Sequence, residues 1–157
     1  MAINFLESDI EKMIFENLDT VHERGFIKFH RETFRQHRLE SGGIIDLLTF
    51  QEDEDAFRFK IIELKRSEIN IDTLQQAIKY FDDYTAQHFH TLKLKNIECD
   101  IILCGDSISN SMVNLLEMGC NIKVYLYDFN YCGLCFKNAK TKNFDNPSFD
   151  LPKEMFL

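Results

Sequence analysis

Apolar residues recur every three or four positions near the start of the chain, which predicts an amphipathic helix over residues 5–20. Two pairs of residues have the spacing of a capping box for its first turn: Asn4 with Glu7, and Ser8 with Glu11. The pattern does not choose between these two starts.

Two further helices follow later in the chain. Asn70 or Asp72 caps one of them, and its apolar residues share a single face. The other covers residues 109–119, where Gly119 provides the stop signal.

The remaining apolar segments are short and bounded by polar residues or glycine, as strands are. Two of them are separated only by the acidic loop QEDED, which predicts a hairpin. The order α-β-β-β-α-β-α-β predicts an α/β fold, with a central mixed β-sheet flanked by helices. The five predicted strands cover residues 26–34, 44–50, 56–65, 97–105 and 121–129.

The length of 157 residues fits one domain. We expect this domain to occupy residues 1–129. Residues 130–157, which show no clear period, are expected to form a C-terminal extension packed on the same domain.

The formal net charge of −8 opposes non-specific binding of nucleic acid by bulk electrostatics. The basic residues are concentrated, however, because five of them lie between Arg24 and Arg38, with Glu32 as the single acid in that stretch. A local basic strip of this kind can follow a phosphate backbone even on an acidic protein.

No apolar run approaches the roughly 20 residues that a membrane helix needs, and the first residues have no basic segment typical of a secretory signal. We therefore expect a cytoplasmic protein without a membrane partner. Its five cysteines are expected to be reduced. Cys132 and Cys135 form an isolated CxxC, and a zinc site needs four ligands.

The stretch that carries chemistry is the predicted hairpin. Asp46 lies inside an apolar strand, where a carboxylate is costly to bury without a partner. Glu63 and Lys65 share one face of the next strand, since residues two apart point to the same side. Two convergent carboxylates suit Mg²⁺ or Mn²⁺, and a lysine beside them can hold or deprotonate the attacking water. The alternative is structural: Asp46 pairs with Lys65 or Arg66.

The order of these residues resembles the PD-(D/E)xK nuclease superfamily, which has a restriction-endonuclease-like core. Gln76-Ala77-Ile78-Lys79-Tyr80 further resembles the Gln-x-x-x-Tyr motif of its RecB-like branch. The segments LESDIEKMIFENLD, GGIIDLL and IIELKRSEINIDTLQQAIKYF are most similar to the catalytic domain of the NucS-type endonucleases. This resemblance covers residues 5–129. It departs from the superfamily name in one respect, because Asp46 follows Ile45 and not proline.

The resemblance implies a metal-dependent endonuclease, a hydrolase of phosphodiester bonds. Asp46 and Glu63 would hold Mg²⁺ or Mn²⁺, with the Leu64 carbonyl as a third ligand. Lys65 would position or activate water.

The resemblance also implies supporting residues. Gln76 would order the site, and Tyr80 would contact phosphate or support Lys65. The acid of the first helix would be Glu7 or Glu11, and Glu7 gives the better alignment. Either glutamate also fits a purely structural role as a helix cap.

The expected partner is nucleic acid, DNA before RNA, bound by Arg31, Arg35, Arg38 and Arg66. The NucS-type enzymes have a separate N-terminal DNA-binding domain without a counterpart here, so a specific substrate does not transfer. Targeting would come from a homodimer, as in a junction-resolving or defence nuclease, or from a partner chain. The alternative is a non-catalytic nucleic-acid-binding or protein-interaction module of the same fold.

Overall fold

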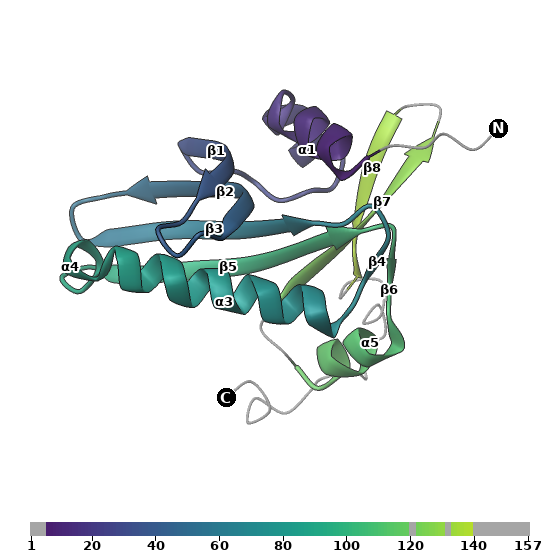
Figure 1. Cartoon of the computed structure of the whole chain (residues 1–157). Helices are drawn as coiled ribbons and strands as arrows, with labels where there is room; N and C mark the ends of the chain where they lie inside the picture. The colour runs from purple at the N-terminus through teal and green to yellow at the C-terminus, as the bar shows by residue number, and fades with distance from the viewer. Residues whose placement is uncertain (1–5, 120–121, 131–132, 140–157) are drawn as a thin grey trace.

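The computed structural model describes residues 6–119, 122–130 and 133–139. Its centre is a six-stranded mixed sheet with the order β1-β2-β3-β5-β7-β8 (Figure 1). Strands β1 to β3 are antiparallel, β3, β5 and β7 run parallel, and β8 returns antiparallel to β7. The predicted mixed sheet is thus confirmed. The strands are β1 Glu32–Arg38, β2 Ile44–Glu52, β3 Ala56–Leu64, β5 Asn96–Gly105, β7 Lys123–Asn130 and β8 Gly133–Asn138.

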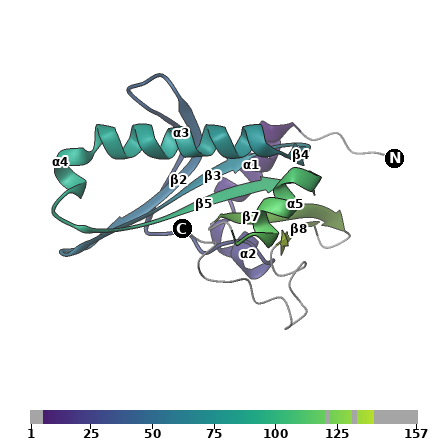
Figure 2. The ribbon, with the colours of Figure 1, turned by 90° about the horizontal axis from the view of Figure 1, so that it is seen from below.

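Helices lie on both faces of the sheet, as predicted. Figure 2 shows α3 along the near face, with α1 and α2 behind the strands. β4 (Glu68–Ile69) and β6 (Ser107–Ile108) form a separate, short parallel pair. Within the described ranges, no helix is long and apolar enough to cross a membrane. The helices are α1 Glu7–Phe15, α2 Leu18–Glu23, α3 Ile71–Gln87, α4 Phe89–Leu92 and α5 Asn110–Glu117.

The alternating side chains of β3 supply the core on both faces of the sheet. Ile62 and Leu64 pack in one cluster with Ile10 of α1. Phe59 belongs to the cluster on the other face, which contains Tyr84 of α3. Burying an apolar side chain of this size stabilises the fold by roughly 1.5–3 kcal/mol. The two-residue period of β3 therefore fixes which of its residues face each helical layer.

The single predicted N-terminal helix is divided into two. The break falls at Asn17, whose backbone leaves the helical region (φ −139°) and whose Nδ2 donates to the Met13 carbonyl at 2.8 Å. The start also differs from the two predicted capping boxes. Leu6 is the N-cap, and its N–H donates to the Asp9 carboxylate at 3.0 Å. Ser8 lies inside α1, and Asn4 lies outside the described residues.

The first strand begins later than predicted. Residues 26–30 are not part of β1, and Phe26 and Ile27 are both buried, at 3% and 5% exposed. Two consecutive buried side chains do not fit a strand with one solvent face. Instead, Phe26 stacks on Phe136 of β8 at 4.4 Å between ring centroids. The aromatic residues thus anchor the connection, and the strand follows it.

The predicted boundary at residues 129 and 130 falls within β7. The next strand, β8, pairs with β7 and buries Leu134 and Phe136 in the core shared with α1 and α2. This part of the predicted extension therefore belongs to the sheet. Residues 140–157 lie outside the described part of the chain.

Asn70 caps α3, one of the two residues predicted for this role. Its side-chain oxygen accepts from the Thr73 N–H at 3.1 Å. We expect Asn70→Ala to lower the free energy of unfolding by about 1 kcal/mol, because the first turn of the helix loses this acceptor. Urea denaturation measures the change. Asn70→Asp, which keeps the acceptor, should retain most of the stability, and an equal loss in both variants would contradict the capping role.

Candidate active site

The hairpin register brings Asp46 and Glu63 together. Leu47 pairs with Ile62 in the antiparallel ladder, and the next position along it sets Asp46 opposite Glu63. The Asp46 N–H donates to Glu63 Oε1 at 3.5 Å, and the Leu64 N–H donates to Asp46 Oδ2 at 2.8 Å. The carboxyl groups therefore meet near the start of β2 and the end of β3.

Burial makes this pair costly to ionise. Glu63 is only 3% exposed. Desolvation raises the pKa of the Glu63 carboxyl, and the charge of Asp46 raises it further, while Lys65 opposes the shift weakly. Desolvation likewise raises the pKa of Asp46, against the hydrogen bond from the Leu64 amide, and the charges of Glu11 and Glu7 add to the rise. In the protein alone, the two carboxyl groups thus hold a proton more tightly than ordinary carboxyls do.

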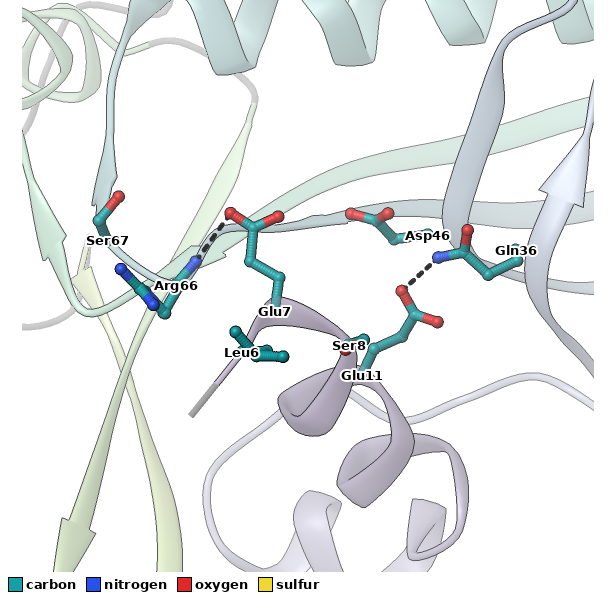
Figure 3. Close-up of a pocket in the computed structure, with 8 residues that line it drawn as sticks. All are labelled: Leu6, Glu7, Ser8, Glu11, Gln36, Asp46, Arg66 and Ser67. Atoms are coloured by element: carbon teal, nitrogen blue, oxygen red, sulfur yellow. Dashed lines mark hydrogen bonds between the residues drawn. The ribbon is translucent and has the colours of Figure 1, made fainter. Parts of the chain in front are cut away.

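A cleft of about 600 Å³ opens onto Asp46 of this pair. Asp46 lies at its wall, between residues of α1 on one side and Gln36 of β1 on the other (Figure 3). Glu63 is not among the lining residues, so Asp46 is the member of the pair that the cleft reaches. The lining consists of Leu6, Glu7, Ser8, Glu11, Gln36, Asp46, Arg66 and Ser67.

Glu7 faces the cleft from the first turn of α1. Its Oε1 accepts from the Arg66 N–H at 3.2 Å, and the Arg66 carbonyl accepts from the Tyr127 hydroxyl of β7. The peptide groups on both sides of Arg66 are thus held by α1 and by β7. Gly105 also packs closely against this loop. A Cβ on Gly105 would lie 2.5 Å from the Ser67 carbonyl oxygen, so the glycine permits the close contact.

Glu11 has a different environment from Glu7. It is 3% exposed, and its two oxygens accept from Arg35 Nε and Gln36 Nε2, each at 2.5 Å. Both oxygens are therefore engaged by β1. Of the two glutamates predicted as the acid of the first helix, Glu7 is the exposed one, and Glu11 joins α1 to β1.

The structure places Lys65 directly after β3, half-buried, where its N–H donates to the Cys104 carbonyl at 2.7 Å. Gln76 Nε2 donates to the Tyr80 hydroxyl at 2.8 Å on α3. The Tyr80 ring lies over the start of β2, where a Cβ on Gly43 would lie 2.6 Å from it. Within the described part of the chain, neither Gln76 nor Tyr80 donates to or accepts from Asp46, Glu63 or Lys65.

The four arginines predicted to bind nucleic acid occupy different parts of the protein. Arg66 lines the cleft, and Arg35 is held beside it by Glu11 and by the Ser8 carbonyl at 3.2 Å. Arg38 is exposed at the end of β1, paired with Ile44 two residues before Asp46. Arg31 precedes β1 and lies toward the opposite end of the sheet. There the pKa of the Asp53 carboxyl is lowered mainly by Gln51 and, to a smaller extent, by Arg31.

The residues of this site that were not predicted from the sequence include Gln36, Ser67 and Tyr127. Gln36 has a left-handed backbone with φ of +54°, a conformation that costs a residue other than glycine roughly 1–3 kcal/mol. No sequence signal marks it, because glutamine has no preference for this conformation. Ser67 lines the cleft directly after Arg66, and Tyr127 of β7 donates to the Arg66 carbonyl, a long-range contact between β7 and the residues after β3.

Two of the cysteines fit the predicted reduced state. Cys99 and Cys104 are free thiols. Cys104 is fully buried in the core, as expected of a small apolar residue. Cys132 lies outside the described residues, so the CxxC stays a feature of the sequence.

The oxygen donors at the site match the requirements of a hard divalent cation. Among the described residues, no three His, Cys, Asp or Glu side chains form a ready metal cage. Asp46 and Glu63 provide two carboxylates, and the Leu64 carbonyl is an adjacent backbone oxygen. Mg²⁺ is commonly held by one or two carboxylates, with water and substrate phosphate completing its octahedron. The donor set therefore fits a cation of this class.

The raised pKa values have a consequence for stability. Because the native state holds the proton more tightly than the unfolded chain, the pair lowers the free energy of unfolding as the pH rises above about 4. We expect Glu63→Gln in EDTA to exceed the wild type in stability by about 1 kcal/mol or more at pH 8. The difference should shrink toward pH 4.

Urea denaturation at several pH values measures this difference. Glu98→Gln on β5 is the matched control, because Glu98 is exposed and its one salt bridge among the described residues is with Arg58. A Glu63→Gln variant that is less stable than the wild type at every pH would contradict the assignment.

The chain resembles solved structures of known proteins. The solved structures that match include a repair endonuclease from Pyrococcus abyssi, at 24% identity and a TM-score of 0.49, covering 76% of this chain and 46% of that one. Another is EndoMS in complex with double-stranded DNA, at 24% identity and a TM-score of 0.50, covering 74% of this chain and 42% of that one. The chain thus spans less than half the length of either protein, and the second likeness shows a shared fold.

No curated protein matches the chain. Residues 6–123 match the family model described as the endonuclease NucS C-terminal domain. This match covers well over half of the sequence and includes every residue of the cleft. The chain therefore belongs to the NucS endonuclease C-terminal domain family.

Proposed function

We propose that this chain is a metal-dependent nuclease of the PD-(D/E)xK type that hydrolyses phosphodiester bonds in DNA. The observation that carries the proposal is the buried Asp46/Glu63 pair beside an open cleft. Two like charges are costly at this position unless a cation compensates them. A strongly raised pKa in a cleft also marks a candidate functional group.

In the proposed site, Asp46, Glu63 and the Leu64 carbonyl hold Mg²⁺ or Mn²⁺. The bound cation would stabilise the negative charge that develops on the phosphate and lower the pKa of nearby water. Leu64 fits this task because its N–H already orients the Asp46 carboxylate at 2.8 Å.

Lys65 positions the attacking water and assists removal of its proton. The water oxygen forms a new bond to phosphorus, the bond from phosphorus to one ester oxygen breaks, and that oxygen leaves with a proton as an alcohol. Lys65 follows Glu63 by two residues, and its backbone is fixed by the hydrogen bond to Cys104. A lysine held in this way reaches the same side of the sheet as Glu63.

Glu7, Gln76 and Tyr80 complete the proposed machinery. Glu7 faces the cleft and is the first-helix acid that we favour. The Gln76–Tyr80 hydrogen bond supports membership of the RecB-like branch with its Gln-x-x-x-Tyr motif. Tyr80 then supports the start of β2 and contacts the substrate phosphate together with Gln76.

The choice of DNA rests on the family and on charge. EndoMS, whose fold this chain shares, has been solved with double-stranded DNA. Arg66 in the cleft and Arg38, which pairs with Ile44 two residues before Asp46, supply positive charge near the acidic site. At a net charge of −8, a homodimer or a partner chain would supply the remaining affinity and the targeting.

A second candidate is a non-catalytic module that binds nucleic acid or protein. The burial of Glu63, which does not line the cleft, and the absence of a three-ligand group among the described residues favour it. Such a module would bind its partner without cleavage, even in Mn²⁺.

The test is cleavage of single-stranded, duplex and branched DNA and of RNA, in Mg²⁺, Mn²⁺ or EDTA. We expect metal-dependent cleavage of DNA, abolished by Glu63→Ala. Lys65→Ala should lower the rate by about 10²-fold or more, because a positioned acid–base group contributes at least this much. Gel assays of labelled substrates measure both.

Lys79→Ala and Glu98→Gln are the controls, since these exposed residues lie on the outer side of α3 and on β5. Both should cleave at the rate of the wild type. Binding without cleavage of any substrate, equal in the wild type and in Glu63→Ala, would support the non-catalytic module and refute the nuclease.

A further inference from the structure

The backbone of Gln36 is unusual for a strand. Successive side chains of a strand point to opposite faces, yet those of Arg35 and Gln36 both reach Glu11. The left-handed φ of +54° at Gln36 makes this possible. The ladder continues on both sides, with Arg35 opposite Leu47 and His37 opposite Ile45, so the distortion is confined to one residue.

That one residue lies opposite Asp46. Gln36 and Asp46 occupy the ladder position between the two regular pairs, and they share no ladder pairing of their own. A residue other than glycine keeps a left-handed conformation only where its surroundings hold it there. Among the described residues, Gln36 is the only such case. The strained residue therefore lies directly across from Asp46, the candidate metal ligand.

Glu11 holds this arrangement in place. Its carboxylate is 3% exposed, and it accepts from two consecutive residues of β1, one of them charged. Removing a carboxylate from water is costly, and charge-assisted hydrogen bonds offset that cost. The buried Glu11 carboxylate of α1 therefore fixes the position of the Gln36 amide.

The rest of the Gln36 amide is available to a ligand. Gln36 is exposed and lines the cleft, and its hydrogen bond to Glu11 uses one of the two N–H groups of Nε2. In the described part of the chain, its Oε1 and second N–H have no partner. Figure 3 shows Arg66 and Ser67 at one end of the cleft and Gln36 at the other, with Asp46 and Glu7 between them.

We propose that Gln36 is a substrate-binding residue whose amide donates to a phosphate oxygen of the DNA strand, on the far side of Asp46 from Arg66. The strand would then cross the cleft from Arg66 to Gln36 and pass Asp46 between them. Glu11 is the positioning residue, and it acts through Gln36. The inference rests on the proposed nuclease function.

The test is the affinity for fluorescein-labelled duplex DNA in Mg²⁺, measured by fluorescence anisotropy in full-length protein that carries Lys65→Ala to prevent cleavage. Gln36→Gly removes the amide and leaves a residue that adopts the left-handed backbone without strain. We expect it to raise Kd about tenfold, the loss typical of one hydrogen bond to a charged group. Gln36→Asn, which keeps an amide and tolerates this backbone, should lose less.

The salt dependence separates direct binding of phosphate from a general loss of structure. Gln36→Gly should leave the slope of log Kd against log salt unchanged, because no charge is removed. Arg66→Ala should lower that slope by about one. Gln51→Ala is the matched control: its Nε2 also donates to a carboxylate, that of Asp53 at 3.3 Å, at the other end of β2. It should bind DNA as tightly as the parent.

Two outcomes would overturn the inference, and they are distinguishable. If the unsubstituted protein cleaves DNA and Gln36→Gly binds as tightly as its parent, only the role of Gln36 fails. An equal loss in Gln36→Gly and Gln51→Ala refutes it in the same way. If the unsubstituted protein neither cleaves nor binds DNA, the proposed nuclease fails, and the role of Gln36 fails with it.

Discussion

The pairing of two carboxyl groups across β2 and β3 is the constraint on which the site depends. Leu47, Ile62 and Leu64 are buried against α1, so the register of the hairpin is set by the core. A slip of one residue would turn every apolar side chain of the hairpin to the wrong face. The same register sets Asp46 opposite Glu63. The apolar core thus holds the two carboxyl groups close together, although their burial and mutual repulsion are unfavourable. The hydrogen bond from the Leu64 N–H to Asp46 offsets part of this cost.

Helix α1 contributes to the site in two ways that its sequence does not distinguish. Glu7 and Glu11 are one turn apart and both line the cleft. Glu11 is buried and engaged by β1, whereas Glu7 is exposed and fixes the peptide group of Arg66. Glu11 therefore joins α1 to the sheet, and Glu7 joins α1 to the loop after β3. A site with supports of this kind holds its geometry before any ligand arrives.

Much of the fold followed from periodicity, because the apolar residues of β2, β3 and α3 keep the spacing of their elements. The convergence of Asp46 on Glu63 followed from the hairpin in the same way. The first strand was placed too early, since Phe26 and Ile27 look like strand residues but are buried by contacts with β8 that are remote in sequence. That error also affects Arg31, which lies beyond the strand, at the opposite end of the sheet from the cleft. Gln36 and Tyr127 depend on tertiary contacts alone, and no local pattern predicts them.

The most direct test of the central claim is calorimetric titration of the wild type with Mn²⁺ near pH 7, in buffers of different ionisation enthalpy. A cation held by Asp46 and Glu63 must displace the proton that their raised pKa values retain. The account predicts Mn²⁺ binding with proton release, and the loss of both in Glu63→Gln. Equal Mn²⁺ affinity and equal proton release in the two proteins, or no binding by the wild type, would contradict it.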